Sequence, residues 1–182
     1  FRGKRVTASS FDYSSESLLI KNIDLGMRGA HQIKNASVAI AVIEELVKKG
    51  FPVGESHIRA ALGKTRFPGR LELLREKPAV IIDGAHTPEG MRLLKSSIQS
   101  MYPDKKPLLL FGALKDKNYR KLAGIVAPMA KAVMCVPPQS DRSLDSVEFS
   151  EIFTSLGVKA FSAETVDNGF LRLMEMASDD DL

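Results

Sequence analysis

The sequence has 182 residues, of which 44% are hydrophobic and 26% charged, so it can form one globular domain together with part of another. The net charge is +4, but the Lys and Arg residues are mixed with acids, form no basic stripe and are accompanied by no Trp, which argues against a nucleic-acid-binding protein. A mildly basic surface suits small anionic substrates such as nucleotides and polycarboxylates.

The sequence also lacks the features of an exported or membrane-embedded protein. No apolar run approaches the roughly 20 residues that cross a bilayer, and the first ten residues contain no hydrophobic signal region. The single cysteine, Cys135, lies in the apolar run AVMCV and is expected to pack in the core. We therefore expect a cytoplasmic protein that binds no membrane.

Residues 1–66 begin with short β-like runs at 5–9 and 18–23. A long helix follows, indicated by apolar residues that step by three and four along the chain: Ile33, Ala36, Ile40, Ile43 and Val47. A shorter helix is expected over residues 55–62. The sequence Phe67-Pro68-Gly69 then interrupts the helical pattern, so we place a domain boundary between residues 67 and 68.

The second part of the chain alternates between two patterns. Short apolar runs are typical of strands buried on both faces, and they lie at 79–82, 108–111, 132–136 and 158–161. Amphipathic helical stripes follow each run, at 91–101, 122–129, 149–156 and 166–177. This alternation predicts an α/β fold with a mostly parallel, doubly wound, Rossmann-like sheet, in which ligands bind at the carboxyl ends of the strands.

The segment IIDGAHTPE places polar residues at such a strand end. Asp83 follows a buried strand, Gly84 permits a tight turn, and Thr87 can cap a helix that starts with Pro88. Asp83 is a candidate to bind a nucleotide ribose, with His86 near the phosphates. The alternative is a simple Asp turn followed by a helix cap. We expect Asp83 and His86 to end a central parallel strand and to face residues 1–66.

Three further segments carry candidate ligand-binding residues. In FPGRLE, the Arg70 guanidinium can grip a phosphate, or it can be an ordinary surface arginine after a turn. In HQIKNA, His31 and Asn35 share one helix face, and the Asn35 amide can read an adenine edge or cap the helix. In FGALKDK, Lys117 can meet an anionic substrate, or the loop can be a solvated charged one.

No other catalytic motif is present in the sequence. Gly63-Lys64-Thr65 resembles the end of a P-loop, but the glycine that the motif requires five residues earlier is replaced by Ile58. There is no zinc-type cluster of Cys and His and no nucleophile elbow, and we expect no metal ligands in this chain.

Taken in order, HQIKNA, FPGRLE, DGAHTP and FGALKDK resemble the C-terminal half of folylpolyglutamate synthase and dihydrofolate synthase, members of the Mur ligase family. The resemblance covers residues 26–181. It implies that residues 1–67 are the end of a central ATPase domain and that 68–182 are the C-terminal glutamate ligase domain. It also implies ATP and Mg²⁺ as cofactors, folate or dihydropteroate and L-glutamate as substrates, an acyl-phosphate intermediate, and a monomer.

By this resemblance, Asn35 contacts the adenine, Arg70 the nucleotide, and Asp83 the ribose or phosphate side. His86 lies close to the reacting phosphates, and Lys117 lies near the incoming glutamate, so these two are the catalytic candidates. The P-loop, the magnesium ligands and a carbamylated lysine of the family are not in this chain, which we therefore expect to be inactive alone. The family continues after residue 182 into a last strand.

Two alternatives to a folate ligase remain open. Thr87 stands where the folate enzymes usually have Asn, and it favours a Mur ligase of peptidoglycan synthesis. The pair His31-Gln32 and the Lys-Asp-Lys loop favour the folate enzyme. The second alternative is a doubly wound nucleotide-binding domain without catalysis.

Overall fold

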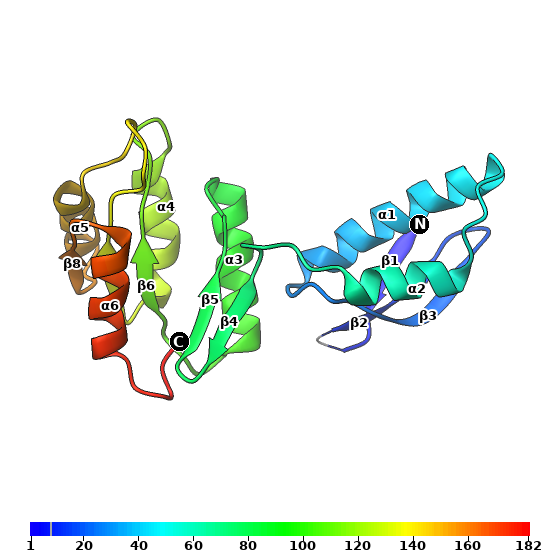
Figure 1. The fold of residues 1–182 in the computed structure, drawn as a ribbon, viewed down its shortest axis with the longest axis horizontal. Helices are drawn as coiled ribbons and strands as arrows, with labels where there is room; N and C mark the ends of the chain where they lie inside the picture. The colour runs from blue at the N-terminus through cyan, green and yellow to red at the C-terminus, as the bar shows by residue number, and fades with distance from the viewer. Residues whose placement is uncertain (8) are drawn as a thin grey trace. The chain divides into compact units, whose positions relative to one another are not determined.

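The computed structural model describes residues 1–7 and 9–182, which divide into two compact units, Phe1–Glu72 and Leu73–Leu182 (Figure 1). The strand expected over residues 5–9 includes Ala8, which lies outside the described residues. The described part of that stretch forms the end of the first strand and the turn that follows it.

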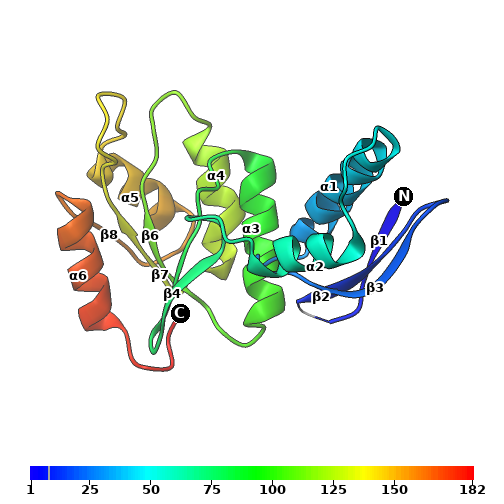
Figure 2. The same ribbon diagram turned by 45° about the vertical axis from the view of Figure 1, so that its right-hand side comes forward.

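Unit 1, Phe1–Glu72, is a three-stranded antiparallel sheet covered by two helices. Its strands pair in sequence order: β1 (Arg2–Arg5), β2 (Ser10–Ser14) and β3 (Leu19–Asp24). The helices α1 (His31–Lys48) and α2 (Glu55–Lys64) follow, and α1 packs against β1 while α2 packs against β3 (Figure 2).

The core of unit 1 forms between the sheet and the apolar stripe of α1. The stripe predicted from the sequence is confirmed at Ile33, Ala36 and Ile40, which are buried against sheet residues such as Phe11. It ends before the last turn of α1, where Val47 is 44% exposed.

Unit 2, Leu73–Leu182, alternates strands and helices as the sequence predicts. Its strands are β4 (Glu72–Glu76, which starts one residue earlier), β5 (Ala79–Ile82), β6 (Leu108–Phe111), β7 (Ala132–Cys135) and β8 (Ala160–Ser162). Its helices are α3 (Pro88–Met101), α4 (Tyr119–Val126), the short 3₁₀ helix η1 (Ala127–Met129), α5 (Ser146–Ser155) and α6 (Val166–Met176).

The parallel sheet β6-β7-β8 is covered on both faces. Side chains of β7 and of the residue after it alternate between the two faces. Val133 and Cys135 join a cluster with residues of α4 and α5, whereas Met134 and Val136 join a cluster with Leu173 of α6. The expected core position of Cys135 is confirmed, and its burial raises the pKa of the thiol to about 12. Helices on both faces of a parallel sheet confirm the doubly wound, α/β class.

The expected place of β5 in that sheet is wrong. Among the described residues its strand partner is β4, in a separate two-stranded sheet, and not a strand of the β6-β7-β8 sheet. Only Lys77 and Pro78 connect β4 to β5, and so short a connection joins antiparallel neighbours. Asp83 therefore follows a strand as predicted, but β5 is only partly buried and is not a central strand of the parallel sheet.

Candidate functional site

The five candidate residues fall into two groups, one in each unit. Asn35 and Arg70 belong to unit 1, and Asp83, His86 and Lys117 belong to unit 2. Each group has its own local geometry.

The first turn of α1 carries a chain of polar contacts. The Asn35 amide donates through Nδ2 to Gln32 Oε1 at 3.0 Å, and Gln32 Nε2 lies 3.0 Å from Nε2 of His31. The helix is preceded by Ala30, which makes no side-chain cap, so Asn35 does not serve as the N-cap that the alternative reading proposed. Gln32 is buried and Asn35 is exposed. The Asn35 amide therefore lies at the surface, and its hydrogen bond to Gln32 fixes its orientation.

The turn that carries Arg70 is anchored next to the start of α1. Leu71, with a φ of +46° and only 1% exposed, follows Arg70 directly. A Cβ atom on Gly29 would come within 2.8 Å of the Leu71 side chain and within 2.8 Å of the His31 ring, so these three residues are close neighbours. The structure thus brings the FPGRLE and HQIKNA segments together within unit 1.

Arg70 itself remains exposed on this anchored turn. Its guanidinium carbon lies 6.0 Å from the centroid of the Phe67 ring, a cation–π distance, and the Gly69 amide donates to Glu72 Oε2 at 2.8 Å. Gly69 has a φ of +68°, a conformation that glycine adopts without strain. The backbone on both sides of Arg70 is therefore fixed, while its charged end faces solvent.

In unit 2, Asp83 and His86 lie on one tight turn after β5. Asp83 Oδ1 accepts from the Ala85 amide at 2.9 Å, which closes the turn. Nδ1 of His86 lies 2.9 Å from the Gly84 carbonyl oxygen, and this oxygen can only accept a hydrogen bond. The contact therefore places the proton of a neutral His86 on Nδ1 and leaves Nε2 as the acceptor, exposed to solvent.

Helix α3 begins immediately after this turn. The predicted cap is confirmed, since Thr87 accepts from the Gly90 amide at 3.1 Å and Pro88 occupies the first turn. The unpaired amides and positive dipole end of a helix N-terminus favour bound anions. His86 thus stands between a carboxylate, Asp83, and a site with positive potential.

The loop after β6 carries Lys117 in a small charge cluster. Lys117 Nζ lies 3.4 Å from Asp116 Oδ2, so the two neighbouring side chains form an ion pair. Burial alone raises the pKa of Asp116, but the charges of Arg142 and Lys117 outweigh it and hold the pKa below its usual range. Asp116 is therefore ionised near neutral pH and partly neutralises its two cationic partners.

Arg142 is the residue of this cluster that sequence reasoning missed. It comes from the loop after β7, and its NH1 lies 3.0 Å from Asp116 Oδ2. Its backbone carbonyl also accepts from the Lys115 amide at 2.8 Å, which ties the loops after β6 and β7 together. The sequence did contain a signal for Arg142, because this residue follows the apolar run at 132–136 and ligand-binding residues gather at such strand ends.

The described residues contain no group of three or more His, Cys, Asp or Glu side chains that could hold a metal ion. In the same part of the chain, no helix is both long and apolar enough to cross a membrane.

Proteins similar in sequence include enzymes named for folylpolyglutamate and dihydrofolate synthesis. The chain is 31% identical to the dihydrofolate synthase/folylpolyglutamate synthase of Bacillus subtilis over 146 residues, which cover 78% of this chain and 34% of the relative. It is 27% identical to the folylpolyglutamate synthase of Lacticaseibacillus casei over 145 residues, covering 78% and 33%. The chain thus spans about a third of the length of these curated relatives.

Solved structures share the fold over nearly the whole chain. Escherichia coli FolC in complex with DHPP and ADP matches with a TM-score of 0.84 and 24% identity, covering 97% of this chain and 40% of that one. The Thermotoga maritima folylpolyglutamate synthase matches with a TM-score of 0.78 and 27% identity, covering 96% and 40%. The profile of the Mur ligase glutamate ligase domain matches residues 69–182, and the chain therefore belongs to the Mur ligase family.

Proposed function

We propose that this chain is part of an ATP-dependent ligase that joins L-glutamate to folate or dihydropteroate. The observation that carries this proposal is the match to the glutamate ligase domain over residues 69–182, together with sequence relatives named for folylpolyglutamate synthesis. These relatives also favour the folate reaction over peptidoglycan synthesis and over a domain without catalysis. We place the enzyme in the cytoplasm, as a monomer.

The residues of unit 1 are proposed to bind the base and phosphates of ATP. The exposed Asn35 amide can both donate to and accept from an adenine edge, and Gln32 fixes its orientation. Arg70 offers a planar, permanently charged fork from a turn that is anchored on both sides, which suits a phosphate. Similar structures are described in complex with ADP, which supports a nucleotide as ligand.

The residues of unit 2 are proposed to act near the reacting groups. Asp83 can accept from a ribose hydroxyl, and the start of α3 can receive phosphate oxygens. The exposed Nε2 of His86 can accept a proton near the phosphates. Lys117 can bind a carboxylate of the incoming glutamate, and its pairing with Asp116 sets its position.

The reaction needs two steps. The substrate carboxylate attacks the terminal phosphate of ATP, which forms an acyl phosphate and releases ADP. The amine of glutamate then attacks the acyl carbon, phosphate leaves, and the amine loses a proton. Both steps depend on positioning and on neutralising phosphate charge, which are the tasks proposed for Arg70 and the α3 N-terminus.

We assign no step to a metal ion in this chain. A similar structure from Yersinia pestis is described with AMPPNP and a Mn ion, which supports a divalent metal in the intact ligase. The described residues offer no three-ligand group for it, so we propose that its ligands lie outside this chain.

The test is ATP-dependent ligation of L-glutamate by the protein expressed from the complete reading frame. Arg70→Ala should lower turnover about 30- to 1000-fold, the loss of a charge-assisted phosphate contact, and Arg70→Lys should restore only part of it. The 182-residue chain by itself should neither hydrolyse ATP nor ligate glutamate, because it contains no P-loop.

Arg75→Ala is the matched control, since Arg75 is an exposed arginine on the neighbouring strand β4. Thermal unfolding of both variants separates lost folding from lost chemistry. Near-normal turnover of Arg70→Ala would remove Arg70 from the site, and absence of any ligase activity in the unmodified protein would refute the function itself.

A further inference from the structure

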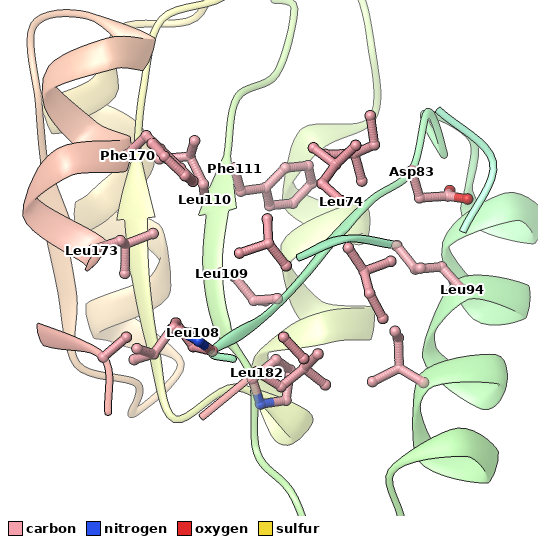
Figure 3. A pocket seen from close by; sticks show the side chains of 18 of the residues that line it. Leu74, Asp83, Leu94, Leu108, Leu109, Leu110, Phe111, Phe170, Leu173 and Leu182 are labelled. Carbon is pink, nitrogen blue, oxygen red and sulfur yellow. The ribbon is translucent and has the colours of Figure 1, made fainter. Parts of the chain in front are cut away.

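Two features of the molecule could add ligand selectivity to the proposed function. One is a cavity of about 480 Å³ in unit 2, which is lined mainly by apolar side chains, among them Leu94, Phe111 and Phe170 (Figure 3). A lining of this kind holds few polar groups that would select one ligand over another. The other feature is the pair His31-Gln32 at the start of α1, whose hydrogen bonds have a direction and can therefore select a ligand.

Gln32 is a buried carboxamide on the first turn of α1. It is 6% exposed, and among the described residues it is the one Asn or Gln that is buried. Both ends of its carboxamide are used: Oε1 accepts from Asn35 Nδ2 at 3.0 Å, and Nε2 lies 3.0 Å from Nε2 of His31. Loss of either contact would leave a buried polar atom unsatisfied, so Gln32 is held in this orientation.

These contacts have a fixed direction, from Asn35 through Gln32 to His31. Since Gln32 Oε1 accepts from Asn35, the other end of the carboxamide, Nε2, can only donate. Nε2 of His31 is then the acceptor, so a neutral His31 carries its proton on Nδ1. Turning the Gln32 carboxamide over would bring two donors together at Asn35 and two acceptors together at His31.

The His31 ring is held in place by close packing. A Cβ atom on Gly29 would come within 2.8 Å of this ring and within 2.8 Å of the side chain of Leu71, which is only 1% exposed. Gly29 has a φ of +99°, a conformation that favours glycine. The ring therefore has little room to turn, and it forms the fixed end of the three contacting side chains.

The outer end is the carboxamide of Asn35, which is exposed. Its Nδ2 is directed at the buried Gln32, so its Oδ1 lies on the side away from Gln32, towards solvent. This oxygen can accept a hydrogen bond and cannot donate one. At position 6 a purine carries either an amino group, which donates, or an oxo group, which accepts. Oδ1 of Asn35 therefore matches a 6-aminopurine and is repelled by a 6-oxopurine.

We propose that Gln32 and His31 are positioning residues that make Asn35 select a 6-aminopurine nucleotide over a 6-oxopurine nucleotide. Neither residue touches the base, and both act by holding the Asn35 carboxamide in one of its two orientations. A carboxamide that is not held can present either Oδ1 or Nδ2, and it then accepts both kinds of base. The inference rests on the proposed function, because it takes Asn35 as the residue that contacts the base.

The test measures equilibrium binding of ATP and of inosine triphosphate, a 6-oxopurine nucleotide, to the protein expressed from the complete reading frame. The unmodified protein should bind ATP at least about tenfold more tightly than inosine triphosphate. Gln32→Leu removes both contacts of Gln32 and should reduce this ratio to about threefold or less. ATP itself should bind only about twofold more weakly to this variant, because about half of the Asn35 carboxamides still present Oδ1.

Two further variants test the direction of the contacts. Gln32→Glu keeps an acceptor towards Asn35, and His31 can donate to its second oxygen, so the ratio should be retained. His31→Phe does not touch Asn35, but it removes the acceptor of Gln32 and leaves the Gln32 and Asn35 carboxamides able to turn over together. It should therefore lower the ratio, and it replaces Gln32→Leu as the test if that variant does not fold.

Ser37→Ala is the matched control, because the buried Ser37 hydroxyl donates to the Ile33 carbonyl within the same helix at 2.7 Å. Thermal unfolding of every variant separates lost folding from lost selectivity. An unchanged ratio in a folded Gln32→Leu or His31→Phe protein, or an equal fall in Ser37→Ala, would overturn the inference, and continued glutamate ligation by these proteins would leave the proposed function standing. Equal binding of both nucleotides by the unmodified protein would also overturn the inference, whereas binding of neither would refute the proposed function as well.

Discussion

Removal of the Glu44 carboxylate tests how α1 is held to the antiparallel sheet of unit 1. This side chain accepts hydrogen bonds from the hydroxyls of Tyr13, Ser15 and Ser17, the latter two at 2.6 and 2.7 Å. Tyr13 is fully buried, so Glu44→Ala leaves its hydroxyl without this partner, which costs about 1–3 kcal/mol. Because Ser17 is exposed and its hydroxyl can turn to water, we expect a total loss of about 2–3 kcal/mol.

The neighbouring Glu45 provides the matched control. Glu45 forms an ion pair with Lys48 at 2.6 Å, but the two side chains are 65% and 61% exposed. Glu45→Ala should therefore cost no more than about 0.5 kcal/mol. Urea unfolding followed by circular dichroism measures both variants. A Glu44→Ala variant within about 0.5 kcal/mol of the unmodified chain, or a Glu45→Ala variant equally destabilised, would refute the reasoning.

The same cluster predicts the pH range over which this stabilisation holds. Burial raises the pKa of Glu44, but the hydrogen bonds from Ser15, Tyr13 and Ser17 outweigh it and leave the pKa below 4.5. The contribution of ionised Glu44 to the free energy of unfolding is thus present above about pH 4.5 and is lost as pH falls through the folded-state pKa. Burial, and then the hydrogen bond to Glu44, raise the pKa of Tyr13 to about 12. The contribution of the protonated Tyr13 hydroxyl to the free energy of unfolding is therefore complete below pH 10 and is lost towards pH 12. The stability difference from Glu44→Gln should shrink on acidification.

Three other local features give measurable outcomes. The hydrogen bond with Lys131, and then those from Ser178, lower the pKa of Asp181 to about 2 against the opposing effect of burial. Asp181→Asn should therefore cost about 1 kcal/mol at pH 7 and nothing below pH 2 in urea unfolding. Thr87→Ala should lower stability by about 1 kcal/mol through loss of the α3 cap, and Thr87→Ser should not. Gly124→Ala should stabilise the protein by about 0.5–1 kcal/mol, because a methyl group at this position of α4 meets no other atom. Gly69→Ala should destabilise it by about 1 kcal/mol, because the φ of Gly69 is +68°. Calorimetry that shows the same sign for both glycine substitutions would contradict this reasoning.

The features that the sequence predicts well are those set by local pattern. The apolar run at 132–136 contains β7, whose four residues are all buried, because strands buried on both faces need continuous apolar residues. Thr87 followed by Pro88 marks the start of α3, because a cap and a proline satisfy requirements within one turn.

The features that could not be predicted from the sequence depend on partners that lie far away along the chain. β2 and β4 have only five residues each, SFDYS and ELLRE, and they form strands because neighbouring strands supply the pairing. The position of Arg142 after an apolar run was a sequence signal, but its contact with Asp116 joins positions 26 residues apart, which no local spacing reveals. The closeness of Gly29, His31 and Leu71 likewise comes from packing within unit 1.

The mismatch at β5 is informative for the same reason. Its sequence, AVII, is apolar throughout, as expected for an interior strand, yet Ile82 is 39% exposed. Leu74 on the adjoining strand β4 is 58% exposed. The continuous apolar sequence of β5 therefore predicts more burial than its two-stranded sheet provides, and the interior position predicted for this strand is wrong for the described residues.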